Sequence, residues 1–206
     1  MVLTEGNLQF TFPGEKAIKF DETEFYKVHF NKLSGAKGVD FICDTDKFLL
    51  LLEVKDCAGN EADNRWRIAV NDEKVTTTLT TVNTTGRESL DNEVAYKVAL
   101  TISCLLGAQT YGDVYRPRYK AKDLIPYAKA LEEDKIVQRN KDVFVVLFLE
   151  GTFGSDTRPK SAIMKRIRDT LETKLDWLNC KVSVEDINTY RKDEHALYHV
   201  RSEERR

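Results

Sequence analysis

The residues of this chain best suited to chemistry are two acids and a lysine beside two apolar runs. Glu53 and Lys55 end the apolar run FLLLLEVK that begins at residue 48. Side chains alternate between the faces of a strand, so Glu53 and Lys55 share a face with Leu49 and Leu51. Burying a carboxylate and an ammonium there is costly unless they pair, bind a metal or reach solvent. The end of this strand is therefore a candidate functional site.

The third chemical group is Asp40, in a short apolar segment upstream. Residues 38–43 read GVDFIC, and the DTDK that follows has the composition of a hairpin connection. If residues 38–43 and 47–55 pair as antiparallel strands across that turn, Asp40 lies beside Glu53 on one face. Two carboxylates and a lysine then converge, with the oxygen ligands that a hard divalent cation prefers.

Asp40 followed by Glu53-Val54-Lys55 on the next strand resembles the signature of the PD-(D/E)xK nuclease superfamily, which has the restriction-endonuclease-like fold. Val39 stands at the position of the nominal proline of that signature. The resemblance implies that Asp40, Glu53 and the backbone carbonyl of Val54 hold Mg²⁺ or Mn²⁺, while Lys55 assists the attacking water. It also implies hydrolysis of nucleic acid, with DNA favoured over RNA, by a homodimer or within a larger protein complex.

The elements that must position these residues can be read from the hydrophobic pattern. Alternation around Pro13-Gly14 predicts a hairpin over residues 7–20, and the acidic start at 21–24 favours a helix over a strand for 21–32. Residues 88–107 have the clearest helical pattern, ending at Gly107, with a buried stripe formed by Leu90, Val94, Val98, Ile102 and Leu105. A shorter helix is expected over 123–134.

Residues 143–149 are apolar on both faces, which predicts a central strand covered by helices. Pro159 opens a further helix, and residues 181–184 form a short last strand. Together these elements predict a mixed α/β (α+β) fold with a central mixed sheet flanked by helices, in an order like that of the restriction-endonuclease-like fold.

Further acids and lysines are candidates for supporting roles at the site. By the resemblance, Glu22 on the helix ahead of the sheet can add a metal ligand; the alternative is a carboxylate at a helix start near solvent. Glu93 and Lys97 are spaced i, i+4. They form either a solvated ion pair or a pair that a helix packed behind the sheet offers to the site.

Two basic segments are candidates for nucleic-acid contacts. Guanidinium and ammonium groups bind phosphates and an indole stacks on bases, and these segments hold Arg65, Trp66, Arg67, Arg116, Arg118 and Lys120. The alternatives are solvated loops and a tryptophan that packs on the core.

The bulk composition bounds the class of protein. The chain has 206 residues, of which 41% are hydrophobic and 32% charged. This suits a single domain over 1–206, with a polar insertion or long loop at about 56–87 and a charged C-terminal tail. No run can span a membrane, no signal peptide is visible, and the four cysteines are scattered, so a cytoplasmic protein is expected. A net charge of −2 counts against a stand-alone DNA binder.

Three interpretations follow from these residues. The first is a Mg²⁺-dependent nuclease. The second is a noncatalytic nuclease-fold module for binding or assembly in a defence or repair complex. The third is an ion pair at a strand end that serves stability alone.

Overall fold

The computed structural model describes residues 1–14, 16–57, 89–111, 121–132, 141–154 and 159–202. The strands are β1 (Val2–Glu5), β2 (Leu8–Thr11), β3 (Ala17–Lys19), β4 (Phe41–Asp44), β5 (Phe48–Asp56), β6 (Asp142–Glu150), β7 (Lys181–Glu185) and β8 (His199–Ser202). The α-helices are α1 (Glu24–Val28), α4 (Leu90–Tyr111), α5 (Ile125–Glu132) and α7 (Lys160–Lys174). Short 3₁₀ turns are η1 (Phe20–Glu22), η2 (Phe30–Lys32), η5 (Ala121–Asp123) and η6 (Asp176–Leu178).

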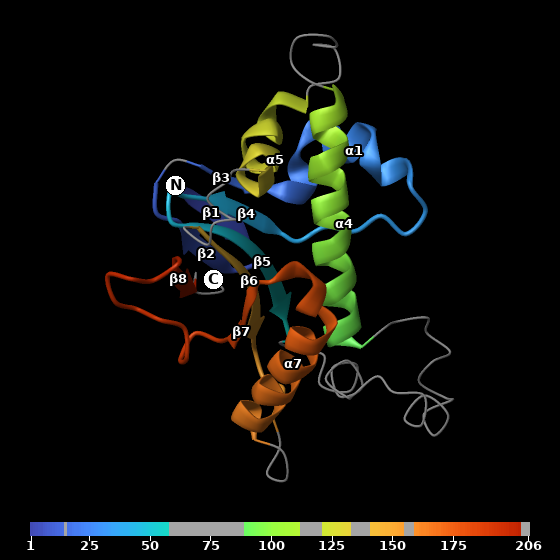
Figure 1. Ribbon diagram of the computed structural model, residues 1–206. Helices are drawn as coiled ribbons and strands as arrows, with labels where there is room; N and C mark the ends of the chain where they lie inside the picture. The colour runs from blue at the N-terminus through green and yellow to red at the C-terminus, as the bar shows by residue number, and fades with distance from the viewer. Residues whose placement is uncertain (15, 58–88, 112–120, 133–140, 155–158, 203–206) are drawn as a thin grey trace, which may run out of the picture.

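A five-stranded sheet in the order β3-β4-β5-β6-β7 is the centre of the fold (Figure 1). Strands β3, β4 and β5 are antiparallel neighbours, whereas β5, β6 and β7 run parallel. The chain passes through α4 and α5 between β5 and β6, and through α7 between β6 and β7. The prediction of a mixed α/β (α+β) fold with a central mixed sheet and flanking helices is confirmed.

The connection between β4 and β5 is the tight turn that the sequence predicts. The Thr45 hydroxyl accepts a hydrogen bond from the backbone N–H of Phe48 at 3.0 Å, and the Thr45 N–H donates to the Phe48 carbonyl at 2.9 Å. The register pairs Phe41 with Leu52. If this antiparallel register is continued by one residue, Asp40, just before β4, comes opposite Glu53.

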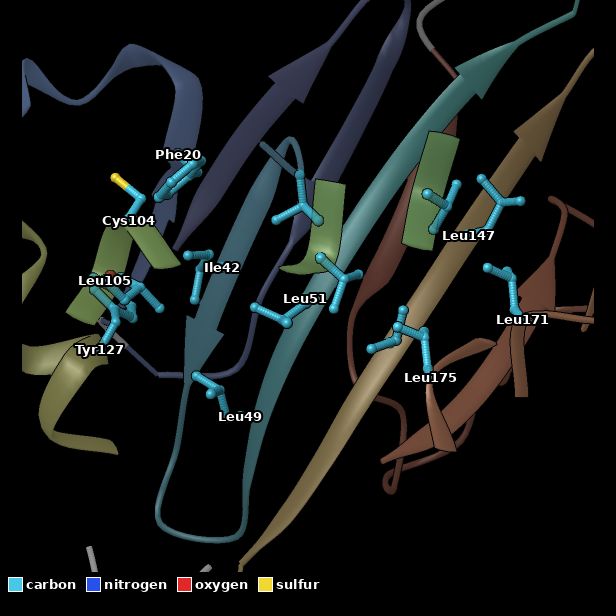
Figure 2. Close-up of a cluster of buried hydrophobic side chains, with 14 of the residues drawn as sticks. Phe20, Ile42, Leu49, Leu51, Cys104, Leu105, Tyr127, Leu147, Leu171 and Leu175 are labelled. Carbon is cyan, nitrogen blue, oxygen red and sulfur yellow. The ribbon is translucent and has the colours of Figure 1, made fainter. Parts of the chain in front are cut away.

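Helices pack on one face of the large sheet. Figure 2 shows Ile42, Leu49, Leu51 and Leu147 of the strands among Leu105, Tyr127, Leu171 and Leu175 of the helical layer. Each buried leucine stabilises the fold by about 1.5–3 kcal/mol relative to an exposed one. Because Glu53 and Lys55 lie on the same face of β5 as Leu49 and Leu51, they point towards the helices at the edge of this core.

The opposite face of the sheet is covered differently from the prediction. Strand β6 is central and buried, as expected, but only one of its faces meets helices. A second sheet in the order β1-β2-β8 covers the other face, through Phe10 and Tyr198 packed on Phe148. The expectation that helices cover this strand is correct for one face and wrong for the other, since an apolar run shows that a strand is covered without showing by what.

The hairpin predicted over residues 7–20 is also wrong. Strand β2 pairs with β1 and β8, while β3 pairs with β4 in the large sheet. Pro13-Gly14 carries the chain between the two sheets, and the N-terminal ammonium of Met1 donates to the carbonyls of Phe12 and Gly14, both at 2.9 Å. Alternation identified strands correctly here, but it does not identify their partners.

Other boundaries differ in smaller ways. The helix expected over 21–32 is present as η1, α1 and η2. Helix α4 continues past Gly107 to Tyr111, because Gly107 does not adopt the left-handed conformation that would end the helix. The polar segment near the C terminus forms β8, anchored by the buried Tyr198 and Val200. Among the described residues, no helix has both the length and the apolar character needed to cross a membrane.

Gly38 allows the close approach that leads the chain into Asp40. A Cβ at this position would lie 2.2 Å from Cε1 of the buried Phe20 ring and 3.5 Å from the Thr101 hydroxyl of α4. The next residue, Val39, donates its N–H to that hydroxyl at 3.0 Å. The absence of a side chain at Gly38 therefore lets η1, α4 and the start of β4 meet.

We expect Gly38→Ala to lower the free energy of unfolding by about 1–3 kcal/mol, because the added methyl group overpacks a closed core. Urea denaturation followed by circular dichroism measures this. Gly107→Ala is the matched control: it lies in α4 with nothing within 4 Å of the new Cβ, so the better helix propensity of alanine should stabilise by about 0.5–1 kcal/mol. Equal stability of Gly38→Ala and wild type would show that Phe20 moves aside without cost.

Candidate active site

Asp40 is fixed by hydrogen bonds on both sides of its backbone. Its carbonyl accepts a hydrogen bond from the N–H of Phe20 at 2.9 Å, and the preceding residue is bound to Thr101 of α4. Its carboxylate Oδ2 accepts a hydrogen bond from the N–H of Val54 at 2.7 Å. Asp40, the residue before β4, is thus hydrogen-bonded to the middle residue of the Glu53-Val54-Lys55 motif on β5.

Glu53 is the most deeply buried acid of the site, with 0% of its surface exposed. Its Oε1 lies 2.8 Å from Nζ of Lys55 and 2.7 Å from Nζ of Lys97. Its Oε2 is buried and makes no hydrogen bond within the part of the chain that the structure describes. One oxygen of this carboxylate is therefore neutralised by two ammonium groups, and the other has unused capacity.

Lys55 sits between two carboxylates. Besides Glu53, its Nζ lies 3.0 Å from Oε1 of Glu93 on α4. Burial, the largest single influence, acts to lower the pKa of Lys55, but the charges and hydrogen bonds of Glu53 and Glu93 outweigh it and raise that pKa above its ordinary value. Lys55 is therefore an ammonium at neutral pH, able to donate hydrogen bonds and stabilise negative charge but not to accept a proton.

Helix α4 supplies Glu93 and Lys97, one turn apart. Nζ of Lys97 lies 4.0 Å from Oδ1 of Asp40 in addition to its contact with Glu53. The side chains of Glu93 and Lys97 are only 14% and 13% exposed. Of the two alternatives from the sequence, the structure favours a pair offered to the site over a solvated ion pair.

The carboxyl group of Asp40 holds a proton more readily than an ordinary aspartate. Burial raises the pKa of Asp40 first, and the nearby charge of Glu53 raises it further, while Lys97 and the N–H of Val54 act to lower it. The net result is a pKa of about 7. Three carboxyl groups, those of Asp40, Glu53 and Glu93, face the two ammonium groups of Lys55 and Lys97, and this arrangement favours an added cation.

The oxygen atoms of the candidate site can be matched to the ligands that a divalent cation prefers. Oε2 of Glu53 has no partner among the described residues, Oδ1 of Asp40 lies 4.0 Å from Nζ of Lys97, and the Val54 carbonyl belongs to the same motif. Mg²⁺ commonly takes one or two carboxylates and keeps several waters. No group of three or more His, Cys, Asp or Glu side chains arranged for a metal ion occurs among the described residues. The residues present fit a hydrated Mg²⁺ or Mn²⁺ better than a metal enclosed by protein ligands.

Glu22, the acid expected to join the site from the preceding helix, lies elsewhere. Its side chain is 59% exposed and its Oε1 is 3.1 Å from Nζ of Lys19. The adjacent Asp21 is the acid that η1 turns inward: its Oδ1 is buried without a hydrogen-bond partner among the described residues. Burial raises the pKa of Asp21, and the charges of Lys19 and Lys97 lower it. Of the two alternatives that the sequence left open for Glu22, its exposed position fits the carboxylate near solvent.

The residues predicted to contact nucleic acid lie outside the described part of the chain. Arg65, Trp66 and Arg67 belong to residues 58–88, and Arg116, Arg118 and Lys120 to residues 112–120, which are not among the described residues. The expected insertion at about 56–87 falls almost wholly in the first of these segments.

Three cysteines can be assessed as nucleophiles. Burial raises the pKa of Cys43 and of Cys104 to about 12, and that of Cys180 to about 11. A thiol at these values is not ionised near neutral pH, so these side chains lack the thiolate that covalent catalysis requires.

The raised pKa of Asp40 predicts a pH dependence of stability. A carboxyl group whose pKa is higher in the folded protein than in the unfolded chain stabilises the fold at low pH and loses that effect as the pH rises through the folded value. Metal-free protein should therefore lose on the order of 3 kcal/mol of unfolding free energy between about pH 4 and pH 7 through this group alone.

Urea denaturation in EDTA at several pH values measures this effect. Asp40→Asn should remove the Asp40 contribution to the slope, while Asp46→Asn, in the exposed turn before β5, should keep the wild-type slope. The same slope for Asp40→Asn and wild type would contradict the assignment.

Comparison with known proteins gives a family but no function. The profile of a family of unknown function, DUF6661, matches residues 23–198. No curated protein and no solved structure is similar enough to count as a match. The matched region contains Asp40, Glu53, Lys55, Glu93 and Lys97 and most of the sequence, so the chain belongs to this family of unknown function, DUF6661.

Proposed function

We propose that this protein is a metal-dependent nuclease that hydrolyses phosphodiester bonds, with DNA favoured over RNA as substrate. The observation that carries the proposal is the convergence of Asp40, Glu53 and Lys55 at the ends of neighbouring strands. The order of elements supports it: an acid on one strand, the Glu-x-Lys strand, a long helix, a parallel central strand, a helix and a last strand. This is the order that the resemblance to the PD-(D/E)xK superfamily implies.

Asp40, Glu53 and the Val54 carbonyl would hold Mg²⁺ or Mn²⁺. When bound, the ion would acidify a water molecule and neutralise charge on the scissile phosphate. The buried, unpartnered Oε2 of Glu53 supports this assignment, because a buried carboxylate oxygen without a partner is costly and a cation would remove that cost.

Lys55 would act as a fixed positive charge beside the reacting phosphate. Two carboxylates orient its ammonium and keep it protonated, and its side chain is 18% exposed, so a substrate can reach it from one side. A preorganised cation in a site with little water stabilises developing negative charge more strongly than one in solvent. Glu93 would position Lys55 without contacting the substrate.

The same proposal includes the cellular compartment and the assembly in which the reaction would take place. Cys43, Cys104 and Cys180 form no disulfide bond in the part of the chain that the structure describes, which supports a reducing compartment such as the cytoplasm. A net charge of −2 is unfavourable for a protein that binds nucleic acid, a polyanion, without a partner protein. This supports work within a protein complex that supplies further basic surface, whereas the homodimer rests on the resemblance alone.

One observation favours the second candidate, a noncatalytic nuclease-fold module for binding or assembly. Lys97 places an ammonium group against both Asp40 and Glu53. A site neutralised by its own lysine can be stable without a metal, and such a module would bind a partner with no chemistry at this point.

Cleavage of single- and double-stranded DNA and RNA with Mg²⁺ or Mn²⁺ tests the proposal. Wild type should cleave and should stop in EDTA, and Lys55→Ala should reduce the rate about 10²–10³-fold, as expected for removal of one transition-state-stabilising group. Lys165→Ala, an exposed lysine on α7, is the control for a general loss of positive charge and should retain activity.

The alternatives give different results in the same experiment. A folded wild-type protein that binds Mn²⁺ without cleaving any substrate would favour the noncatalytic module. A folded protein that neither cleaves nor binds Mn²⁺ would mean that Glu53 and Lys55 form a structural ion pair.

A further inference from the structure

Lys97 is the one ionic group of the candidate site that the proposed function leaves without a role. It comes from α4, not from the strands that carry the motif. Its Nζ lies 2.7 Å from Oε1 of Glu53 and 4.0 Å from Oδ1 of Asp40. The ammonium thus contacts the two carboxylates that the proposed function assigns to the metal.

Helix α4 holds Lys97 firmly in this place. Val94 and Val98 on either side of it along the helix are fully buried in the core. One turn later, the Thr101 hydroxyl accepts a hydrogen bond from Val39, the residue before Asp40. The helix and the Asp40 strand are therefore fastened together next to Lys97, and its position results from packing as well as from charge.

Lys55 does not duplicate this contact. Both lysines share Oε1 of Glu53, but the second carboxylate of Lys55 is Glu93, whereas the second carboxylate of Lys97 is Asp40. Lys55 is held towards Glu93 of α4, whereas the ammonium of Lys97 lies near both Asp40 and Glu53. A cation bound jointly by Asp40 and Glu53 would meet the ammonium of Lys97 first.

We propose that the Lys97 ammonium occupies the cation position of the metal-free site and competes with the divalent ion, so that metal binding requires its displacement. This inference rests on the proposed function, because it assumes that Asp40 and Glu53 bind a metal. The ammonium of Lys97, beside Oδ1 of Asp40 and Oε1 of Glu53, repels a divalent cation that takes Oδ1 of Asp40 and the unpartnered Oε2 of Glu53.

Asp21 offers the displaced lysine a second partner. It lies in η1, the charge of Lys97 acts on it, and its Oδ1 is buried without a hydrogen-bond partner among the described residues. Asp21 is therefore a further acid towards which the displaced ammonium would turn.

Mn²⁺ binding measured by isothermal titration calorimetry tests the competition. Lys97→Met keeps a side chain of similar length without the charge, and it should bind Mn²⁺ about tenfold or more tightly than wild type. Lys165→Met changes the net charge equally but lies exposed on α7, so it should bind as wild type does. Asp40→Asn in the Lys97→Met background should lose the gain.

A second measurement uses the unmodified protein. Limiting acetic anhydride followed by mass spectrometry reports the reactivity of each lysine amine. Lys97 should react slowly without metal, because it is ion-paired and only 13% exposed, and several-fold faster or slower once Mg²⁺ moves it. Lys165 serves as the internal standard whose reactivity stays constant.

The outcomes separate this inference from the proposed function. If wild type binds Mn²⁺ and Lys97→Met binds it equally well, Lys97 is no competitor, and the proposed metal site stands. If neither protein binds Mn²⁺, the proposed site and the competition both fall. Should Lys97→Met not fold, unchanged acetylation of Lys97 at saturating Mg²⁺ overturns the inference, and a changed rate supports it.

Discussion

The structure of the candidate site depends on the burial of Glu53. A fully buried carboxylate at the end of an apolar strand is tolerated only when cations and hydrogen-bond donors replace the water that it loses. Lys55, two residues later on the same strand face, supplies one cation, and Lys97 on α4 supplies the other. The buried carboxylate of Glu53 therefore links the two lysines and connects α4 to the end of β5.

Helix α4 joins the hydrophobic core to the chemistry. Its apolar side is buried against the sheet together with α5 and α7, and its polar residues Glu93, Lys97 and Thr101 meet the ends of β4 and β5. Rigid elements hold reactive groups more accurately than loops do, because packing fixes their rotamers. The candidate site is built in this way, from two strands and one long helix.

Other buried ion pairs of the fold show what a structural role looks like. Asp91 of α4 pairs with Lys174 of α7, and Asp44 at the end of β4 pairs with Lys141 just before β6. In both places a single acid binds lysines of neighbouring segments, since Asp44 also lies 3.7 Å from Nζ of Lys16. At the candidate site, three acids, Asp40, Glu53 and Glu93, face the two lysines Lys55 and Lys97, and Asp40 has a pKa raised to about 7. This unequal balance of charge is typical of functional sites.

The sequence by itself determined the part of the site that is local. Asp40, Glu53 and Lys55 could be placed together because strand alternation fixes their faces and a short turn fixes their register. Glu93 and Lys97 were candidates from the sequence, but only the tertiary structure decided their contacts, the inward position of Asp21, the second sheet and the partners of β2 and β3. Lys97 is 44 residues from Glu53, and Thr101 is 62 residues from Val39. A hydrophobic pattern states which side of an element is buried, but the element that covers it is chosen by the packing of the whole chain, so contacts over such separations cannot be read from local periodicity.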